Sequence, residues 1–266
     1  DEARASKTMV DILQGYGAVP DPRLTLILSK SQAWVQGKDG AEEWKGVPNG
    51  LPVTELSLPE YDNNHNSCIW GYMWGYDWNS AEKGDNISKP KTDADFTPLG
   101  LMNYSEVCFL KAEAALRGWQ GAGDAKTNYE NGIRASFEEM RANAPKDSYS
   151  KSNDDKYISE GNVAWNNADS FEAKLEKIIT QKWIGIYPNS EEAWAEFRRT
   201  GYPKLNPVKQ SLEPTINPKN GEFIKKLRYV DNELSNNKEY ATDPTLNGGQ
   251  GDGLSVRVWW DTARYK

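Results

Sequence analysis

Apolar residues recur at helical spacing through the middle of the chain, and the first such segment begins after Asn103. Residues three or four positions apart lie on one face of a helix. Apolar residues take that spacing at Tyr104, Val107, Leu110 and Ala114. Asn103 suits the N-cap position, Glu106 completes a capping box, and Gly118 interrupts the pattern. The pattern predicts a helix between Asn103 and Gly118 with one apolar stripe.

The same reasoning predicts three further helices. The second opens near Asp124 and carries a buried face made by Tyr129, Ile133, Phe137 and Met140. The third covers about 170–187, with apolar residues in register at Phe171, Leu175, Ile178, Ile179 and Ile186. Asn189 caps a short fourth helix that turns Trp194 and Phe197 inward. Between the second and third helices, residues 145–167 predict a long, polar, mobile link.

Short turns containing glycine or proline join these helices into two pairs. Small residues stand where the paired helices must approach closely, at Ala112, Ala115, Gly132 and Ala135. Such a unit resembles the helix-turn-helix repeat of tetratricopeptide arrays, whose period is about 34 residues. The sequence therefore predicts a mostly α fold with tetratricopeptide-like helix pairs over residues 101–205.

The two flanking segments are rich in loops. Residues 1–100 contain a short predicted helix near 6–14, then many Gly, Pro, Asn and Asp residues without a sustained period. Residues 206–266 are again rich in Pro, Gly and Asn. A helix is predicted near 232–240, and residues 254–260 form an alternating, strand-like run. Long irregular segments in a compact domain are often functional. We expect 1–100 to be the candidate ligand face and 206–266 to close the fold.

Composition narrows the classes of function. The chain has 266 residues, 39 acidic and 32 basic side chains and a net charge of −7. Nucleic acid and anionic lipid require a basic face, which argues against both as the main partner. One histidine, His65, and two cysteines, Cys68 and Cys108, are too few for a clustered zinc site. We expect no metal, no cofactor and no nucleic acid, and no apolar run approaches the roughly 20 residues that span a bilayer.

Aromatic residues concentrate in one short segment, Cys68–Trp78, which reads CIWGYMWGYDW. Five of them stand two positions apart, at Trp70, Tyr72, Trp74, Tyr76 and Trp78. In an extended strand such residues share one face and would form a ladder. An aromatic ladder suits the apolar face of sugar rings, and Asn66 and Asp77 could bond the hydroxyl groups. The alternative, that these rings fill a core beneath loops, is equally consistent with the pattern.

Two further tryptophans, Trp34 and Trp44, lie in a loop rich in Gly, Lys and Glu, where no amphipathic pattern requires a core residue. We include them among the expected ligand-binding residues. Other tryptophans, at Trp183, Trp194, Trp259 and Trp260, are expected to be core by their place in the pattern.

Several segments resemble one protein family. They are Arg4–Asp11, Asn103–Trp119, Gly123–Ser136, the stretch Ile179–Leu205 and the terminal Val258–Asp261. The stretch ITQKWIGIYPNSEEAWAEFRRTGYPKL is the most diagnostic. In this order along the chain, they resemble the SusD/RagB family of outer-membrane nutrient-binding lipoproteins, and specifically its C-terminal half.

This resemblance implies a function and a cellular location. It implies a non-catalytic, cell-surface subunit that captures oligosaccharides, or in some branches peptides, and hands them to a SusC-like TonB-dependent transporter. It also implies a lipid anchor on an N-terminal segment absent from this chain. An open helical array exposes an apolar flank, so we expect the missing N-terminal half to be needed for stable folding.

Besides a helical scaffold that binds no small ligand, two alternatives to a glycan receptor remain at this point. One is a peptide-binding receptor of the same architecture, which would use backbone hydrogen bonds. The other is a glycosidase, since that chemistry needs only two carboxylates at the right separation and the chain carries 39 acids.

Overall fold

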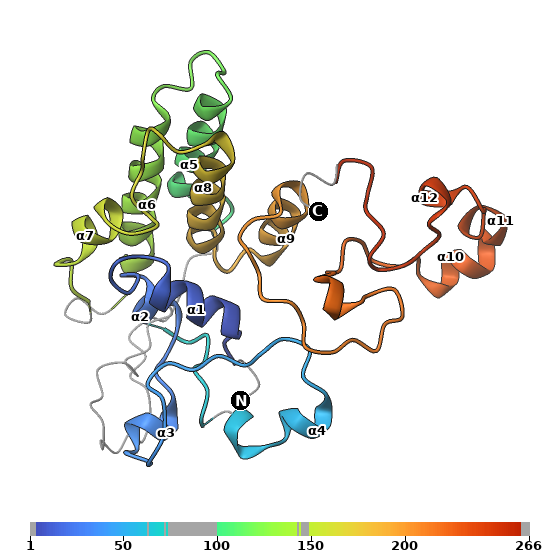
Figure 1. The fold of residues 1–266 in the computed structure, drawn as a ribbon, viewed down its shortest axis with the longest axis horizontal. Coiled ribbons are helices and arrows are strands. Elements are labelled where there is room, and N and C mark those ends of the chain that lie inside the picture. Colours follow the sequence, from blue (N-terminus) through green and yellow to red (C-terminus); the bar gives the residue numbers. More distant parts are fainter. Residues whose placement is uncertain are drawn as a thin grey trace.

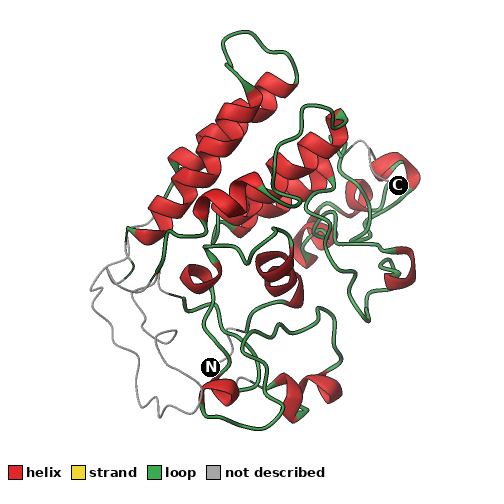
Figure 2. Cartoon of the chain, turned by 60° about the vertical axis from the view of Figure 1, so that its left-hand side comes forward, coloured by secondary structure: helices red, strands yellow, loops and turns green. Residues whose placement is uncertain are grey.

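The computed structural model describes residues 4–62, 64–71, 73, 100–142, 144 and 149–261. Within this part of the chain the regular structure is helical, and strand pairing consists of isolated bridges such as Ser29 with Cys68. Figure 1 shows a layer of longer helices, with short helices and loops below it and a C-terminal segment to one side. The short helices of the loop-rich part are α1 Lys7–Gly15, α2 Leu24–Ile27, α3 Gln32–Val35, α4 Val53–Leu56 and the 3-10 helix Pro59–Tyr61. The predicted loop-rich first segment and helical middle are both seen in Figure 2.

The first predicted helix pair is present as α5, Tyr104–Leu116, and α6, Ala125–Arg141, which pack along their lengths. The second helix opens beside Asp124 as expected, and Asp124 is its cap, because its Oδ1 accepts from the backbone N–H of Thr127 at 2.8 Å. Asn103 makes no side-chain cap on α5. Glu139 of α6 takes that role instead, accepting from the backbone N–H of Ser105 at 2.9 Å. The first turn of α5 is therefore held by its partner helix.

The packed face of α5 lies beside the predicted stripe. Cys108, Phe109 and Ala112 are buried, whereas Tyr104 is 66% exposed and Leu110 is 39% exposed. Apolar residues occur on both sides of this helix, so periodicity alone does not choose between its faces. Contact with α6 and α8 selects the face that carries Phe109.

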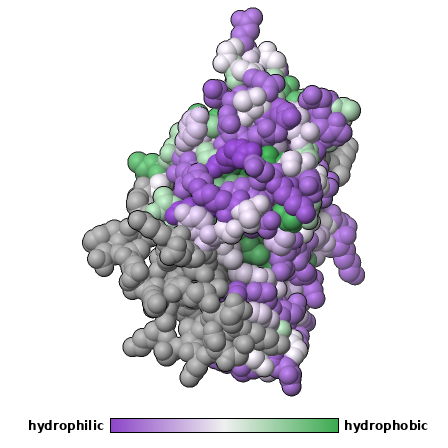
Figure 3. All heavy atoms as spheres, turned by 90° about the vertical axis from the view of Figure 1, so that its left-hand side faces the viewer, coloured by the Kyte–Doolittle hydropathy of each residue, from purple (hydrophilic) through white to green (hydrophobic). Residues whose placement is uncertain are grey.

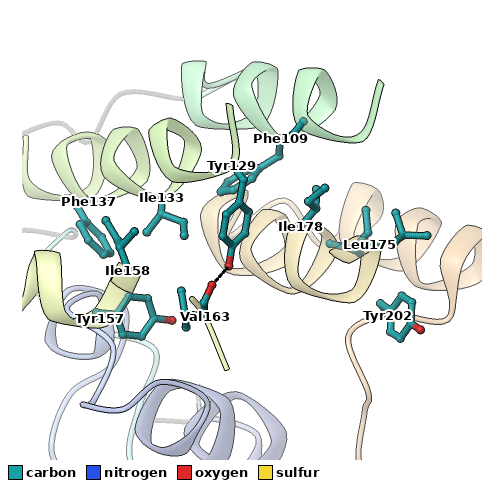
Figure 4. Packing of buried hydrophobic residues seen from close by; sticks show 12 residues of the cluster. Phe109, Tyr129, Ile133, Phe137, Tyr157, Ile158, Val163, Leu175, Ile178 and Tyr202 are labelled. Carbon is teal, nitrogen blue, oxygen red and sulfur yellow. Dashed lines mark hydrogen bonds between the residues drawn. The ribbon is translucent and has the colours of Figure 1, made fainter. Parts of the chain in front are cut away.

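The main core lies between α5, α6 and α8 (Figure 4), and the expected residues Tyr129, Ile133 and Phe137 are all buried in it. The hydroxyl of Tyr129 donates to the carbonyl oxygen of Val163 at 2.8 Å, which satisfies this buried polar group. A Cβ placed on Gly132 would lie 2.7 Å from the Phe109 ring. The small residue is thus required for close helix approach, as the sequence indicated.

The link after α6 is more ordered than expected. It contains a helix, α7 Asp154–Ser159, which the polar composition did not predict. Arg141 of α6 anchors α7 through two hydrogen bonds to the Asp154 carboxylate, at 2.6 and 2.7 Å. Tyr157 and Ile158 of α7 join the core. The face that carries α6 and α7 is otherwise largely hydrophilic (Figure 3).

The second predicted pair is α8, Phe171–Gly185, and α9, Ser190–Thr200. Asn189 caps α9 as expected, accepting from Glu192 N, and Ser170, at the expected start of the third helix, caps α8 by accepting from Ala173 N. Lys182 of α8 is buried, and its ammonium lies 2.7 Å from Glu192 and 3.5 Å from Glu196, both on α9. This charge cluster joins the two helices of the pair.

The C-terminal segment differs from its prediction in two respects. The single helix expected near 232–240 is divided into α10, Asp231–Asn236, and α11, Lys238–Ala241, which are followed by α12, Leu246–Gly249. Residues 254–260 form two turns joined by an irregular segment, and not a strand. Trp259 is 92% exposed, so its assignment to the core was wrong. Trp260 is partly covered because the Arg198 guanidinium stacks over it at 4.8 Å.

An ion pair between α5 and α9 gives a pH prediction. Burial raises the pKa of Glu113, but hydrogen bonds and charge from Arg199 and Arg117 outweigh it, so the pKa is lowered overall. A carboxyl with a lowered folded-state pKa adds stability at neutral pH that is lost as the pH falls through that pKa. We expect Glu113→Gln to flatten the acid limb of the stability curve, measured by urea unfolding from pH 7 down to pH 3. An unchanged acid limb would exclude this pair as its source.

Candidate functional site

A recess of about 540 Å³ draws on the predicted ligand face. We call it the Trp44 recess. It is formed by α1, by the loop that carries Trp44, by the end of the 3-10 helix, and by the start of the C-terminal segment. Its lining includes Lys7, Asp11, Gln14, Trp44, Pro48, Asn49, Tyr61, Asn206 and Lys209. The volume lies within the usual range of small-molecule sites, roughly 300–1,000 Å³.

Two aromatic side chains line the recess. Trp44 is half-buried and also packs against the second core cluster, so the core fixes one part of the indole while another borders the recess. Tyr61 ends the 3-10 helix Pro59–Tyr61, and its carbonyl oxygen accepts a hydrogen bond from the Arg4 guanidinium. The Trp44 indole is therefore held by the core, and the backbone of Tyr61 is held by Arg4.

Polar groups complete the recess. The Lys7 ammonium donates to Asp11 Oδ1 at 2.7 Å, and the Asn206 amide donates to Asp11 Oδ2 at 3.1 Å. The backbone N–H of Asn206 also donates to the Thr8 hydroxyl at 3.3 Å. A cation, a carboxylate and an amide thus form one connected set, which can donate and accept hydrogen bonds toward a ligand.

Of the nine predicted ligand-binding residues, only Trp44 lines this recess among those the structure describes. Trp34 lies in α3 and is half-buried, with the Lys30 ammonium 4.9 Å from its ring centroid. Trp70 is also half-buried. Five others, Tyr72, Trp74, Tyr76, Asp77 and Trp78, lie outside the described residues. A ligand role for all of these stays a prediction.

Asn66 has a clear structural task. It is 1% exposed, and its amide donates to the carbonyl oxygens of Glu60 at 3.0 Å and Asp62 at 2.8 Å. These bonds fix the loop that carries Tyr61. Asp62 also pairs with His65 Nδ1 at 2.8 Å, and although burial raises its pKa, the His65 hydrogen bonds lower it overall. Direct contact between Asn66 and a ligand stays a prediction.

A second recess lies at the junction of α8 and α9. Its volume is about 330 Å³ and its walls are mainly apolar, with Trp183, Trp194 and Phe197 among them. Both tryptophans, expected in the core, are half-buried and border this recess, and Trp183 also packs against the second core cluster. Arg198 stacks on Trp194 at 3.7 Å, which covers one region of that ring.

Sequence reasoning missed most of the Trp44 recess. Lys7 and Asp11 lie four positions apart on one face of α1, a spacing that only indicates an ordinary surface ion pair. Asn206 is 195 positions from Asp11, and no local pattern connects the two. Among the described residues, no three His, Cys, Asp or Glu side chains are grouped closely enough to hold a metal ion.

The described helices include none with the length and apolar content required to cross a membrane.

Comparison with known proteins identifies the family. The model of the SusD-like family, described as SusD and RagB outer-membrane lipoproteins, matches residues 1–261. A comparison with curated proteins gave no match.

Solved structures agree with the family match. A chitin-binding SusD homologue from Flavobacterium johnsoniae is 30% identical, with a TM-score of 0.67, covering 97% of this chain and 49% of its own. A SusD homologue from Bacteroides thetaiotaomicron is 28% identical, with a TM-score of 0.69, covering 97% and 52%. One from Bacteroides vulgatus is 29% identical, with a TM-score of 0.67, covering 99% and 50%.

The chain thus spans about half the length of these homologues. The expected mostly helical fold with tetratricopeptide-like pairs is confirmed by this likeness together with the observed helices. The sequence match, the order of the helix pairs and the shared fold agree, and the chain belongs to the SusD-like family of outer-membrane lipoproteins.

Proposed function

We propose that this chain is the glycan-binding part of a non-catalytic cell-surface lipoprotein that captures oligosaccharides for a SusC-like TonB-dependent transporter. The Trp44 recess carries the proposal, because it places Trp44 and Tyr61 beside a bonded set of polar side chains. Membership of an outer-membrane lipoprotein family supports it, as does the chitin-binding homologue at 30% identity.

The chemistry of the recess suits a sugar. A pyranose has an apolar face of C–H groups and a rim of hydroxyl groups, so it needs an aromatic surface beside donors and acceptors. Trp44 supplies the surface, while Asp11 accepts and Asn206 and Lys7 donate at the rim. These polar groups already bond one another, which lowers the entropy cost of ordering them around a ligand.

The recess also gives a role to each part of the chain. We propose that residues 1–266 are the C-terminal portion of one SusD-like domain, with 1–100 as the ligand face, 101–205 as the helical support and 206–266 as the closing segment. The recess combines Trp44 from the first part with Asn206 from the third. The N-terminal half of the domain, and the lipid anchor that it would carry, are proposed partners.

Trp44→Ala tests the proposal. We expect it to weaken binding of chitooligosaccharides, or of the malto- or xylo-oligosaccharide series that binds best, by about 1–3 kcal/mol. Titration followed by calorimetry measures the loss. Trp119→Ala is the matched control, because Trp119 is 68% exposed in the turn between α5 and α6 and lines neither recess described above.

Each other outcome has a distinct meaning. Equal binding by Trp44→Ala and the unaltered protein would remove the recess from the proposal. Shorter sugars appearing in the mixture on chromatography would identify a glycosidase. Binding of unstructured peptides, with no response to any of the three glycan series, would identify a peptide receptor.

A further inference from the structure

A hollow of about 540 Å³ is lined by the end of α9 and by two segments of the C-terminal part, 220–225 and 250–257. We call it the Lys225 hollow. Its charged lining residues are Lys204, Glu222, Lys225 and Arg257. Three of these four are basic, whereas the whole chain carries a net charge of −7. The hollow is therefore a basic surface in an acidic protein.

Two of the four charged side chains have partners of their own. The Lys204 ammonium lies 2.9 Å from the carboxylate of Glu176 in α8. Glu222 Oε2 accepts a hydrogen bond from the backbone N–H of Asn217 at 2.6 Å. A ligand in the hollow would therefore meet chiefly the other two charged side chains, both of which are basic.

Those two, Lys225 and Arg257, share one buried carboxylate, that of Asp261. Arg257 Nη1 lies 2.5 Å from Asp261 Oδ1, and Lys225 Nζ lies 3.5 Å from Asp261 Oδ2. A third cation, Arg198, is held nearby, because its guanidinium donates to the Lys225 carbonyl oxygen at 3.2 Å. Burial lowers the pKa of Lys225, the two neighbouring guanidinium groups lower it further, and Asp261 offsets only part of this. Three positive charges thus surround a single negative one, and a bound anion would favour the charged ammonium.

An aromatic wall stands beside these cations. Phe197 and Phe223 both line the hollow, with ring centroids 5.1 Å apart and ring planes at 73°. Lys225 Nζ lies 4.7 Å from the centroid of the Phe197 ring. Phe223 is half-buried, so part of its ring is open to a ligand. Uncharged polar side chains complete the lining, at Asn220, Gln250 and Ser255. A matching ligand has an apolar face, an anionic group and hydroxyl groups.

The walls of the hollow are fixed by the fold. The N–H of Lys225 donates to the Leu254 carbonyl at 2.7 Å, so the two lining segments lie side by side (Figure 1). The N–H of Leu254 donates to the Thr215 hydroxyl at 3.0 Å. A Cβ on Gly253 would lie 2.8 Å from Thr215 Cγ2, so glycine is needed for this close approach. The hollow is therefore formed before a ligand arrives.

We propose that the Lys225 hollow binds an acidic sugar residue, whose carboxylate or sulfate group lies between Lys225 and Arg257 and whose C–H face lies against Phe223. This site rests on the proposed function, which makes the ligand a sugar, and adds a second site with a preference for acidic glycans. The described lining residues of the Lys225 hollow and of the Trp44 recess have no member in common.

The test compares sugars that differ in charge. Trigalacturonate is paired with its methyl ester, and 6-sulfated chitotriose is paired with chitotriose. Each is titrated calorimetrically into the unaltered protein. In at least one pair the charged member is expected to bind about tenfold or more tightly, because hydrogen bonds between charged groups are the stronger ones. The pair that responds shows whether the carboxylate or the sulfate is recognised.

Lys225→Met places the preference in the hollow. It keeps the pair of Arg257 with Asp261 and is expected to abolish the advantage of the charged sugar, while leaving the affinity for the neutral sugar unchanged. Lys219→Met is the matched control, because Lys219 is exposed and adjoins the lining residue Asn220 without lining the hollow itself. It removes the same charge and is expected to keep the preference.

Gln250→Glu tests the site without removing a cation. Gln250 is exposed and lines the hollow, and glutamate has nearly the same shape. The added negative charge is expected to repel the charged sugar and to reduce its advantage about tenfold. This variant decides the matter even where Lys225→Met does not fold.

The outcomes separate this second site from the proposed function. Equal affinity for the charged and neutral members of both pairs overturns the second site and leaves glycan capture standing. A preference that survives Gln250→Glu, or that a folded Lys225→Met retains, also overturns it. If none of these sugars and none of the neutral glycan series binds, the second site and the proposed function fall together.

Discussion

Replacing Arg23 by methionine is expected to lower the free energy of unfolding by about 3–5 kcal/mol. Arg23 is fully buried, and its guanidinium donates to Asp21 at 2.6 and 2.9 Å. Methionine would fill similar space but leave the buried Asp21 carboxylate without its cation. An unpaired buried charge costs more than the ion pair itself contributes, and this difference is the source of the large effect.

The same side chain joins four parts of the fold. The Arg23 guanidinium also donates to Ser136 of α6 at 2.8 Å and to Gln181 of α8. Tyr157 of α7 donates to the Asp21 carboxylate. Arg23 precedes α2 directly, so this network attaches the loop-rich ligand face to the helical layer. Losing it is expected to reduce cooperativity as well as stability, seen as a lower m-value in urea.

Two variants make the Arg23 prediction decisive. Arg134→Met removes an exposed partner of Asp155 and is expected to cost less than about 1 kcal/mol. The double variant Asp21→Asn/Arg23→Met also removes the unpaired Asp21 carboxylate. It is expected to recover part of the stability that Arg23→Met loses. A double variant as unstable as Arg23→Met alone would show that packing, and not the unpaired carboxylate, causes the loss. All three are compared by urea unfolding at pH 7.

The helical half of the fold was accessible from the sequence because its signals are local. Asp124, Ser170 and Asn189 were identified as helix caps or helix starts, and each accepts a backbone hydrogen bond at the expected position. The buried residues of α6 were identified from spacing alone, since that helix has one apolar face. Local sequence patterns were therefore sufficient to predict a helix and its buried side where the helix has only one apolar face.

Contacts between residues far apart in the sequence determine the features that the local patterns did not predict. The polar helix α7 is held by Arg141 and by the burial of Tyr157, and neither contact is visible in its own composition. The Trp44 recess joins Asp11 to Asn206 across 195 positions. Aromatic density directed attention to Cys68–Trp78, much of which lies outside the described residues, and within the described part of the chain the Trp44 recess uses the more isolated Trp44 and Tyr61. Residue type indicated sugar binding, but only the fold could show which aromatics stand beside polar groups.

Phe109→Ala is expected to lower the free energy of unfolding by about 3–5 kcal/mol, because it opens a cavity in a core that cannot collapse easily. Phe109 is 1% exposed. Its ring contacts Gly132 of α6 and Gly185 of α8, where added Cβ atoms would lie 2.7 and 3.2 Å away. Both backbones already approach as closely as glycine permits, so neither helix carries a side chain at these positions to fill the space.

Leu110→Ala is the matched control, since it removes a large apolar side chain from the next position of the same helix. Leu110 lies on the other face of α5 and is partly exposed, so its loss is expected to cost less than about 1 kcal/mol. Urea unfolding of both variants measures the difference. If Leu110→Ala proved as destabilising as Phe109→Ala, the second apolar face of α5 would have to be covered in the folded protein. The comparison therefore tests, through stability alone, which of the two apolar faces of α5 is packed.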